Sequence, residues 1–232
     1  MMNSYVRRRT NLKRCAFTGY RPAKMPFGYD ENDPRCIEFK ARLKDTIETL
    51  IGEGYAHFVS GGALGMDLFA AEAVLELQEK YPWIILEMVS PFDAQADRWD
   101  DEYRMRHDRL FASADIVTAT GHEYNKACMF RRNRYIVENA DLLLAAYDGQ
   151  PGGTAMTCEY AREVGVPIRL IMPLASPHDS KVLRSLPLLQ ATEGFICTMK
   201  NPPKRADNHL LRNSAISSGV LPEAFSSAKT LA

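Results

Sequence analysis

AHFVSGGALGMD, residues 56–67, is the stretch of this sequence that best defines the fold. Its first five residues are mostly apolar and predict a buried β-strand, and the glycines that follow predict a tight turn. Residues 68–80 are rich in alanine and leucine, a composition that predicts a helix. A strand that passes through a short turn into a helix is the repeating unit of α/β folds.

The same alternation recurs on both sides of this stretch. Near-continuous apolar strands separated by helices are typical of parallel sheets that are covered on both faces. The sequence therefore predicts an α/β fold with a Rossmann-like open parallel sheet and helices on both faces. The other expected strands lie near residues 15–17, 83–89, 116–118, 141–147 and 168–172, and the other expected helices near 34–51, 95–112, 126–139 and 156–164.

The chain is long enough for one domain with a full core, but short for two. We expect this single Rossmann-like domain to cover residues 14–173, after a basic lead-in over residues 1–13. Beyond it, apolar periodicity fades into a peripheral extension over residues 174–200. Residues 201–232 are rich in Pro, Ser, Ala and Lys, which predicts a disordered tail.

Composition limits the classes of function. Lys and Arg together number 29, as do Asp and Glu, so binding to nucleic acid would need a local basic patch. The five cysteines are widely spaced, and neither they nor the histidines have the spacing of a metal site, so we expect no metal and no cofactor. No apolar run approaches the roughly 18 residues of a membrane span. We expect a cytoplasmic protein without a membrane partner, and its oligomeric state, a homo-oligomer included, stays open.

Ligands of open α/β sheets bind beyond the carboxyl ends of the strands, so the turns after the strands are the candidate sites. Glycines there let backbone N–H groups approach an anion, and a following helix N-terminus adds donors and a positive dipole end. We therefore expect a phosphate-bearing, nucleotide-like ligand. The candidate ligand-binding residues are Thr18, Gly19, Tyr20 and Arg21 in the first turn, Ser60, Gly61, Gly62, Gly65 and Asp67 in the second, and Gly152, Gly153 and Thr154 in the third.

Each turn also has a plainer interpretation. Residues 60–67 could form only a tight strand-to-helix turn, in which Asp67 offsets the helix dipole. Residues 18–22 could form a proline turn with surface side chains, instead of an arginine for phosphate and a tyrosine for a base. The turn at residues 60–67 matches neither the Walker A pattern nor the dinucleotide fingerprint G-x-G-x-x-G, which disfavours typical ATPases and dehydrogenases.

The three turns, together with Ser90-Pro91-Phe92 and Asn139-Ala140-Asp141, resemble the YpsA-like branch of the SLOG superfamily in order and spacing. The resemblance covers roughly residues 14–173. It implies a Rossmann-like fold whose pocket binds, and serves to sense, a nucleotide or a nucleotide-derived phosphate ligand. It also places Pro91 among the ligand-binding residues.

Two groups within the superfamily imply alternative functions. Residues 60–67 are similar to the S-G-x-A-x-G-I-D stretch of DprA, which binds single-stranded DNA. Arg131, Arg132 and Arg134 lie on one predicted helix and could contact its phosphates. Charge balance over the whole chain does not favour this partner.

The second group is the LOG nucleotide hydrolases, which cleave the N-glycosidic bond of nucleoside monophosphates. Their M-x-x-R-K and P-G-G-x-G-T-x-x-E stretches match here in spacing, which implies Arg132 and Glu159 as catalytic residues acting without a metal. The plainer interpretations are a surface salt bridge for Arg132 and a solvent-facing carboxylate for Glu159. The sequence departs from the LOG pattern in three respects. Asn133 replaces its lysine, residues 155–156 are Ala-Met instead of Gly-Thr, and extra residues, including Asp148 and Gly149, separate the strand from Pro151.

Overall fold

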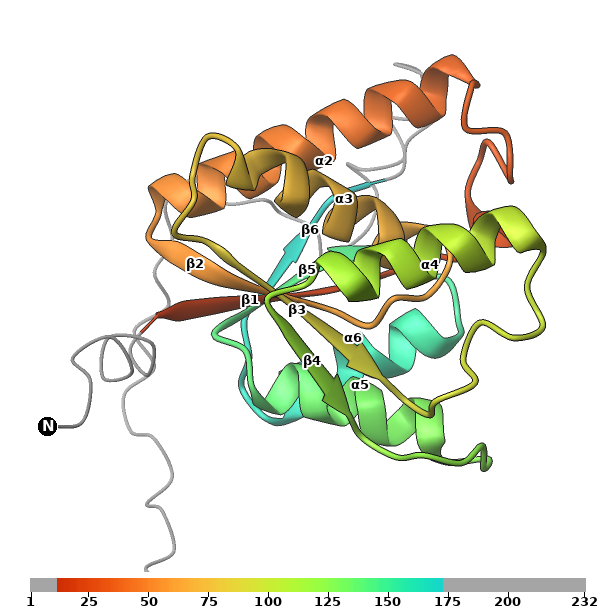
Figure 1. Cartoon of the computed structure of the whole chain (residues 1–232). Helices are drawn as coiled ribbons and strands as arrows, with labels where there is room; N and C mark the ends of the chain where they lie inside the picture. The colour runs from red at the N-terminus through yellow and green to blue at the C-terminus, as the bar shows by residue number, and fades with distance from the viewer. Residues whose placement is uncertain (1–11, 173–232) are drawn as a thin grey trace, which may run out of the picture. The chain divides into compact units, whose positions relative to one another are not determined.

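The computed structural model describes residues 12–172, which form a six-stranded sheet with helices on both faces (Figure 1). All neighbouring strands are parallel, which confirms the predicted α/β class. The strands are β1 (Lys13–Gly19), β2 (Tyr55–Ser60), β3 (Ile85–Ser90), β4 (Ile116–Ala119), β5 (Leu142–Ala146) and β6 (Ile168–Leu170). The helices are the 3-10 turn η1 (Pro22–Lys24), α2 (Pro34–Gly52), α3 (Met66–Gln78), α4 (Asp101–Ser113), α5 (Cys128–Glu138) and α6 (Gly153–Glu163).

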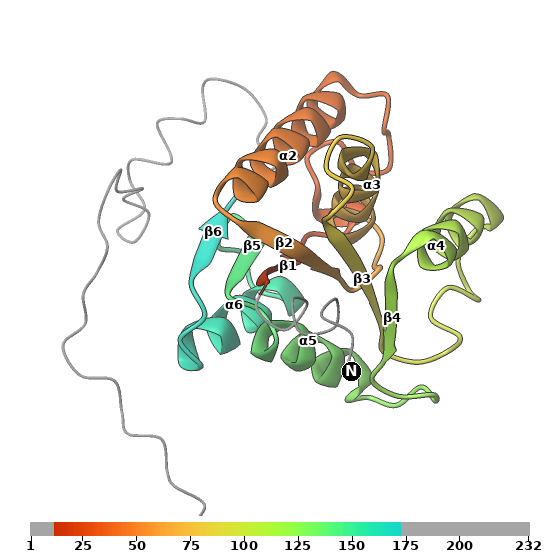
Figure 2. The same ribbon diagram turned by 60° about the vertical axis from the view of Figure 1, so that its left-hand side comes forward.

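The strand order is β4-β3-β2-β1-β5-β6. From β1 the chain moves outward through β2 and β3 to β4, and it then returns to the other side of β1 as β5. Helices α2, α3 and α4 cover one face of the sheet, here called the α2–α4 face, and α5 and α6 cover the other, the α5–α6 face (Figure 2). The connections after β1 and β5 therefore leave in opposite directions, and open sheets bind ligands at such a switch point.

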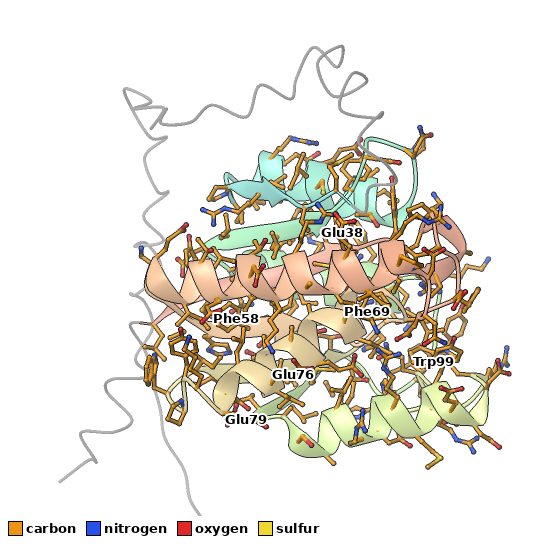
Figure 3. All side chains as sticks on the ribbon, turned by 90° about the horizontal axis from the view of Figure 1, so that it is seen from above. Glu38, Phe58, Phe69, Glu76, Glu79 and Trp99 are labelled. Carbon is orange, nitrogen blue, oxygen red and sulfur yellow. The ribbon has the colours of Figure 1, made fainter. Side chains whose placement is uncertain are left out.

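The alternation of side chains along each strand divides the core between the two faces. On β1, Phe17 belongs to the cluster under α2, α3 and α4, where its ring stacks on that of Phe58 at 5.9 Å. Ala16 points the other way and packs with Leu143 against α5 and α6. Figure 3 views the α2–α4 face, where the three helices lie side by side and Phe69 of α3 contacts the ring of Phe39.

Local sequence explains where α2 begins and ends. The Asp33 carboxylate accepts a hydrogen bond from the Arg35 N–H at 2.8 Å, and Pro34 is the first helical residue, so the predicted start is confirmed. The helix ends at Gly52, and Gly54 then takes a positive φ of 92° that lets the chain turn into β2.

The predicted start of the helix expected over residues 95–112 is wrong, because α4 begins at Asp101 instead of near residue 95. Residues 91–100 instead form turns that lie against residues 61–65 between β2 and α3, here called the glycine turn. The Gln95 side-chain amide donates to the Gly61 carbonyl at 3.1 Å, and Ala96 is buried. A contact between distant segments thus overrides the local helical pattern.

One buried carboxylate links the strands on the α5–α6 face. Glu87 of β3 is 2% exposed and lies 2.8 Å from His57 Nε2 and 2.6 Å from Arg14 Nη2. It also accepts hydrogen bonds from Thr118 at 2.8 Å and from Tyr135 at 3.0 Å. Burial raises the pKa of Glu87, but these donors and the Arg14 charge outweigh burial and lower it to about 2.

Three further predictions concern membrane spans, the terminal segments and the start of α6. Within residues 12–172, no helix is both long enough and apolar enough to span a bilayer. The predicted extension over residues 174–200 and tail over 201–232 lie outside the described residues, as does most of the lead-in. Helix α6 begins at Gly153, slightly before its predicted start, because Gly152 is its N-cap and the helix starts within the third predicted turn.

Candidate functional site

A pocket of about 350 Å³ lies at the switch point between β1 and β5. The pocket is surrounded by the carboxyl end of β1, the η1 turn and the first turns of α3 and α6. Helix α5 closes it on the α5–α6 face. Segments from both ends of the predicted domain therefore meet at one place. The predicted site residues that line this pocket are Thr18, Gly19, Tyr20, Arg21, Asp67, Arg132, Gly153 and Thr154.

The glycine turn before α3 allows close packing beneath the pocket. A Cβ on Gly61 would overlap the Arg132 guanidinium and approach the Asp67 Oδ2 to 2.8 Å. Gly65 has a φ of 88°, and a Cβ there would come within 2.5 Å of the Tyr20 carbonyl oxygen. Side chains at either position would separate the glycine turn from α5 and η1.

Two backbone N–H groups of the same turn donate hydrogen bonds to side chains of the protein itself. The Ala63 N–H donates to the Asp67 carboxylate at 3.3 Å, and the Gly62 N–H donates to the Ser60 hydroxyl at 3.2 Å. Asp67 thus occupies the place expected for an anionic ligand, as in the plainer interpretation of this turn. Phosphate binding by Ser60, Gly61, Gly62 and Gly65, none of which lines the pocket, stays a prediction.

A buried ion pair forms one wall of the pocket. Arg132 Nη1 lies 3.1 Å from Asp67 Oδ2, and the two side chains are 7% and 8% exposed. Burial raises the pKa of Asp67, while the guanidinium of Arg132 and the Ala63 N–H oppose this increase. The Arg132 Nε is buried without a hydrogen-bond partner in residues 12–172, although buried polar groups are normally hydrogen-bonded.

Two cations at the pocket have no carboxylate partner among the described residues. Arg21 is exposed at the start of η1, and Lys24 at its end donates to the Pro151 carbonyl at 2.7 Å. Because Asp67 balances Arg132, Arg21 and Lys24 leave the pocket with a net positive charge. This charge favours an anionic ligand.

The N-terminus of α6 adds backbone donors to this positive region. Gly153 and Thr154 line the pocket, and the helix has neither a side-chain cap nor an acidic residue in its first turn. The Thr154 hydroxyl donates to the Gly19 carbonyl at 3.0 Å, which fixes α6 against the end of β1. The first N–H groups of a helix have no partner within it, so they suit a phosphate here.

The loop from β5 to α6 is fastened to the first turn at two points. The Tyr20 hydroxyl bonds to the Asp148 carboxylate, and Lys24 bonds to Pro151 at the far end of the loop. Burial and the bond to Asp148 raise the pKa of Tyr20 to about 12. The Tyr20 ring is buried edge-on against Tyr147, so it has little surface free for stacking on a base.

The model of the YpsA family, described as the YspA SLOG family, matches residues 15–172. The chain belongs to this family. A UPF0398 protein from Bacillus pumilus is 33% identical over 145 residues, which cover 62% of this chain and 77% of that protein. A second, from Bacillus cereus strain B4264, is 32% identical over 158 residues, which cover 66% and 85%.

Two solved structures of DNA processing protein A share the fold. The protein from Streptococcus pneumoniae has a TM-score of 0.52 at 20% identity and covers 72% of this chain, but only 52% of its own length is matched. The protein from Helicobacter pylori, whose structure concerns single-stranded DNA binding, has a TM-score of 0.50 at 19% identity, with 68% and 64% covered. At such identities the likeness shows the fold alone.

Other predicted residues of this YpsA family chain lie outside the pocket. Glu159 is exposed on α6 and does not line it, whereas Asp67 is the one carboxylate among the lining residues. Gly152 adjoins the Lys24 side chain, and Pro91 is buried near Gly121. Among residues 12–172, no cluster of three metal-ligating side chains forms.

Sequence reasoning also missed lining residues. Lys24 follows the first predicted turn closely, and Pro22, which starts η1, is the signal that could have placed it there. Four of the others come from faces of α5 and α6, whose orientation depends on packing across the sheet, and the rest lie on β1, in η1 or in the turn before α3. The lining residues missed are Phe17, Ala23, Lys24, Ala63, Met129, Asn133, Ile136 and Thr157.

Proposed function

We propose that this chain binds, and serves to sense, a nucleotide or a nucleotide-derived phosphate ligand in the pocket between β1 and β5. The observation that carries this proposal is the unbalanced positive charge of Arg21 and Lys24 beside the uncapped N-terminus of α6. Both features lie at the switch point, where open α/β sheets bind ligands.

The walls of the pocket suit the two parts of a nucleotide. The phosphate would lie at the first turn of α6, within reach of the two cations. Met129 and Ile136 of α5 supply an apolar wall for the nucleoside. A volume of about 350 Å³ falls in the usual range for small-molecule sites.

Isothermal titration with nucleoside mono- and diphosphates and ADP-ribose, with and without Mg²⁺, tests the proposal. Arg21→Ala and Lys24→Ala should each weaken the best ligand about tenfold, because each removes a charge-assisted contact. Lys44→Ala, which removes an exposed lysine of α2 bonded to Glu76, is the control and should leave the affinity unchanged. Failure of every nucleotide to bind would refute the proposal, as would full affinity in both pocket variants.

The same samples separate the two alternatives. Release of free base from a nucleoside monophosphate would identify a LOG-like hydrolase. Of the two catalytic residues expected for that activity, Arg132 lines the pocket and Glu159 does not. Binding of a single-stranded oligonucleotide, with affinity that falls steeply with salt and depends on Arg131 and Arg134, would identify a DprA-like function.

A further inference from the structure

A second pocket, of about 190 Å³, lies directly beside the first, between the N-terminal halves of α5 and α6. Met129, Asn133, Gly153 and Thr157 line both pockets. Because four residues are shared, the two spaces are adjacent compartments of one site.

A fixed polar contact marks the boundary between the compartments. The Asn133 side-chain amide on α5 donates to the Thr157 hydroxyl on α6 at 2.9 Å, and that hydroxyl donates to the Gly153 carbonyl, also at 2.9 Å. Thr157 is 4% exposed, so this contact is firmly held. Gly153, the first residue of α6, therefore lies where both compartments meet the helix N-terminus.

The lining of the second pocket differs from that of the first. Phe130 and Met156 are 43% and 55% exposed, although both are large apolar side chains. The Arg134 guanidinium lies 4.7 Å from the centre of the Tyr160 ring and 5.8 Å from that of Phe130. Lys126, also exposed, has no carboxylate partner in residues 12–172. Flat apolar surfaces beside cations suit an aromatic base attached to phosphate.

We propose that the second pocket binds the distal base of a ligand with two nucleosides joined by a diphosphate. This inference rests on the proposed function, because the proximal nucleoside would occupy the first pocket. The diphosphate would cross the boundary at Gly153, which lines both compartments at the N-terminus of α6. A mononucleotide would leave the second pocket empty and its apolar surface in water.

The occupant proposed is a small molecule instead of a nucleic-acid strand. Lys and Arg match Asp and Glu at 29 each, so no overall positive field attracts a polyanion. Arg134 is itself partly neutralised by Glu138 at 3.3 Å. The second pocket adds room for one further base.

Titration of the wild type with adenosine and guanosine monophosphates, and with the diphosphate-linked dinucleosides of the same bases, tests the inference. We expect a dinucleoside to bind about tenfold more tightly than its monophosphate, as one additional stacked base allows. The double variant Phe130→Ala/Met156→Ala should lose that advantage and bind the monophosphate as the wild type does. Both replaced side chains are substantially exposed, so the fold should persist. Met105→Ala, which removes a 70% exposed methionine on α4, is the matched control and should alter neither affinity.

The outcomes distinguish the two proposals. If the monophosphate binds but the dinucleoside binds no more tightly, or if the double variant keeps the tighter binding, the second-pocket inference is wrong and the proposed function stands. If neither class of ligand binds, both proposals fail. Tighter binding of a single-stranded oligonucleotide than of any dinucleoside would overturn the inference in favour of a strand.

Discussion

Gly61 brings the turn before α3 into close contact with Arg132 of α5. Its missing side chain leaves room for the Arg132 guanidinium, which enters from α5 and pairs with Asp67 of α3. The glycine was recognisable from sequence because it follows a predicted strand. The contact between Gly61 and Arg132 could not be recognised from the sequence. Arg132 lies in a segment whose place against β1 depends on the order of the strands.

Gly61→Ala should displace Arg132 and disturb the buried ion pair. We expect a loss of about 1–3 kcal/mol in the free energy of unfolding, together with weaker nucleotide binding, because a buried charge loses its best partner. Urea unfolding and titration measure the two effects. Gly52→Ala is the control, since nothing lies within 4 Å of its Cβ position and its φ is not positive, and it should be neutral or slightly stabilising. A fully stable Gly61→Ala variant with normal affinity would contradict this account.

At the scale of elements, Glu87 connects β3 to its neighbours through donors on β1, β2, β4 and α5. Its pKa of about 2 is lower than the roughly 4.3 of a glutamate in an unfolded chain. The ionised carboxylate therefore stabilises the fold above about pH 4.3, and this contribution is lost as the pH falls towards 2.

Glu87→Gln should lower the free energy of unfolding at pH 7 by up to about 3 kcal/mol and flatten its decline between about pH 5 and pH 2. Urea denaturation at a series of pH values measures both changes. Glu79→Gln, at an exposed position at the end of α3, should keep the wild-type pH profile. If the free energy of unfolding of the Glu87 variant declined between about pH 5 and pH 2 as it does in the wild type, other carboxylates would control acid unfolding.

The loop between β5 and α6 depends on the Tyr20 hydroxyl, which bonds to Asp148. Tyr20→Phe keeps the buried ring but removes that bond, so amide hydrogens over residues 148–152 should exchange faster while those of β5 stay protected. The expected cost is about 1 kcal/mol. Tyr29→Phe, which changes a 56% exposed ring, is the control for mass-spectrometric exchange. Equal exchange in the two variants would mean that Lys24 and Pro151 hold the loop without Tyr20.

For the whole molecule, sequence patterns were enough to predict the elements and their parallel arrangement. The apolar run at residues 142–146 is easily recognised because β5 is buried on both faces of the sheet. The strand order was not predicted, because no local pattern specifies that β5 pairs with β1 instead of extending the sheet beyond β4. The pocket depends on that pairing, so its turns could be predicted one by one. Of the lining contributed by α5, only Arg132 was predicted, through the LOG resemblance, and Met129, Asn133 and Ile136 were not.

The pairing of Cys15 with Leu142 has a consequence for the order of events in folding. The two walls of the pocket come from segments that are remote along the chain, and closing so large a loop is slow. If β5 docks on β1 after the rate-limiting step of folding, the ligand can bind only the native state. Saturating nucleotide should then slow unfolding in stopped-flow experiments and leave the refolding rate nearly unchanged. Faster refolding with nucleotide would instead mean that β1 and β5 are already paired in the transition state.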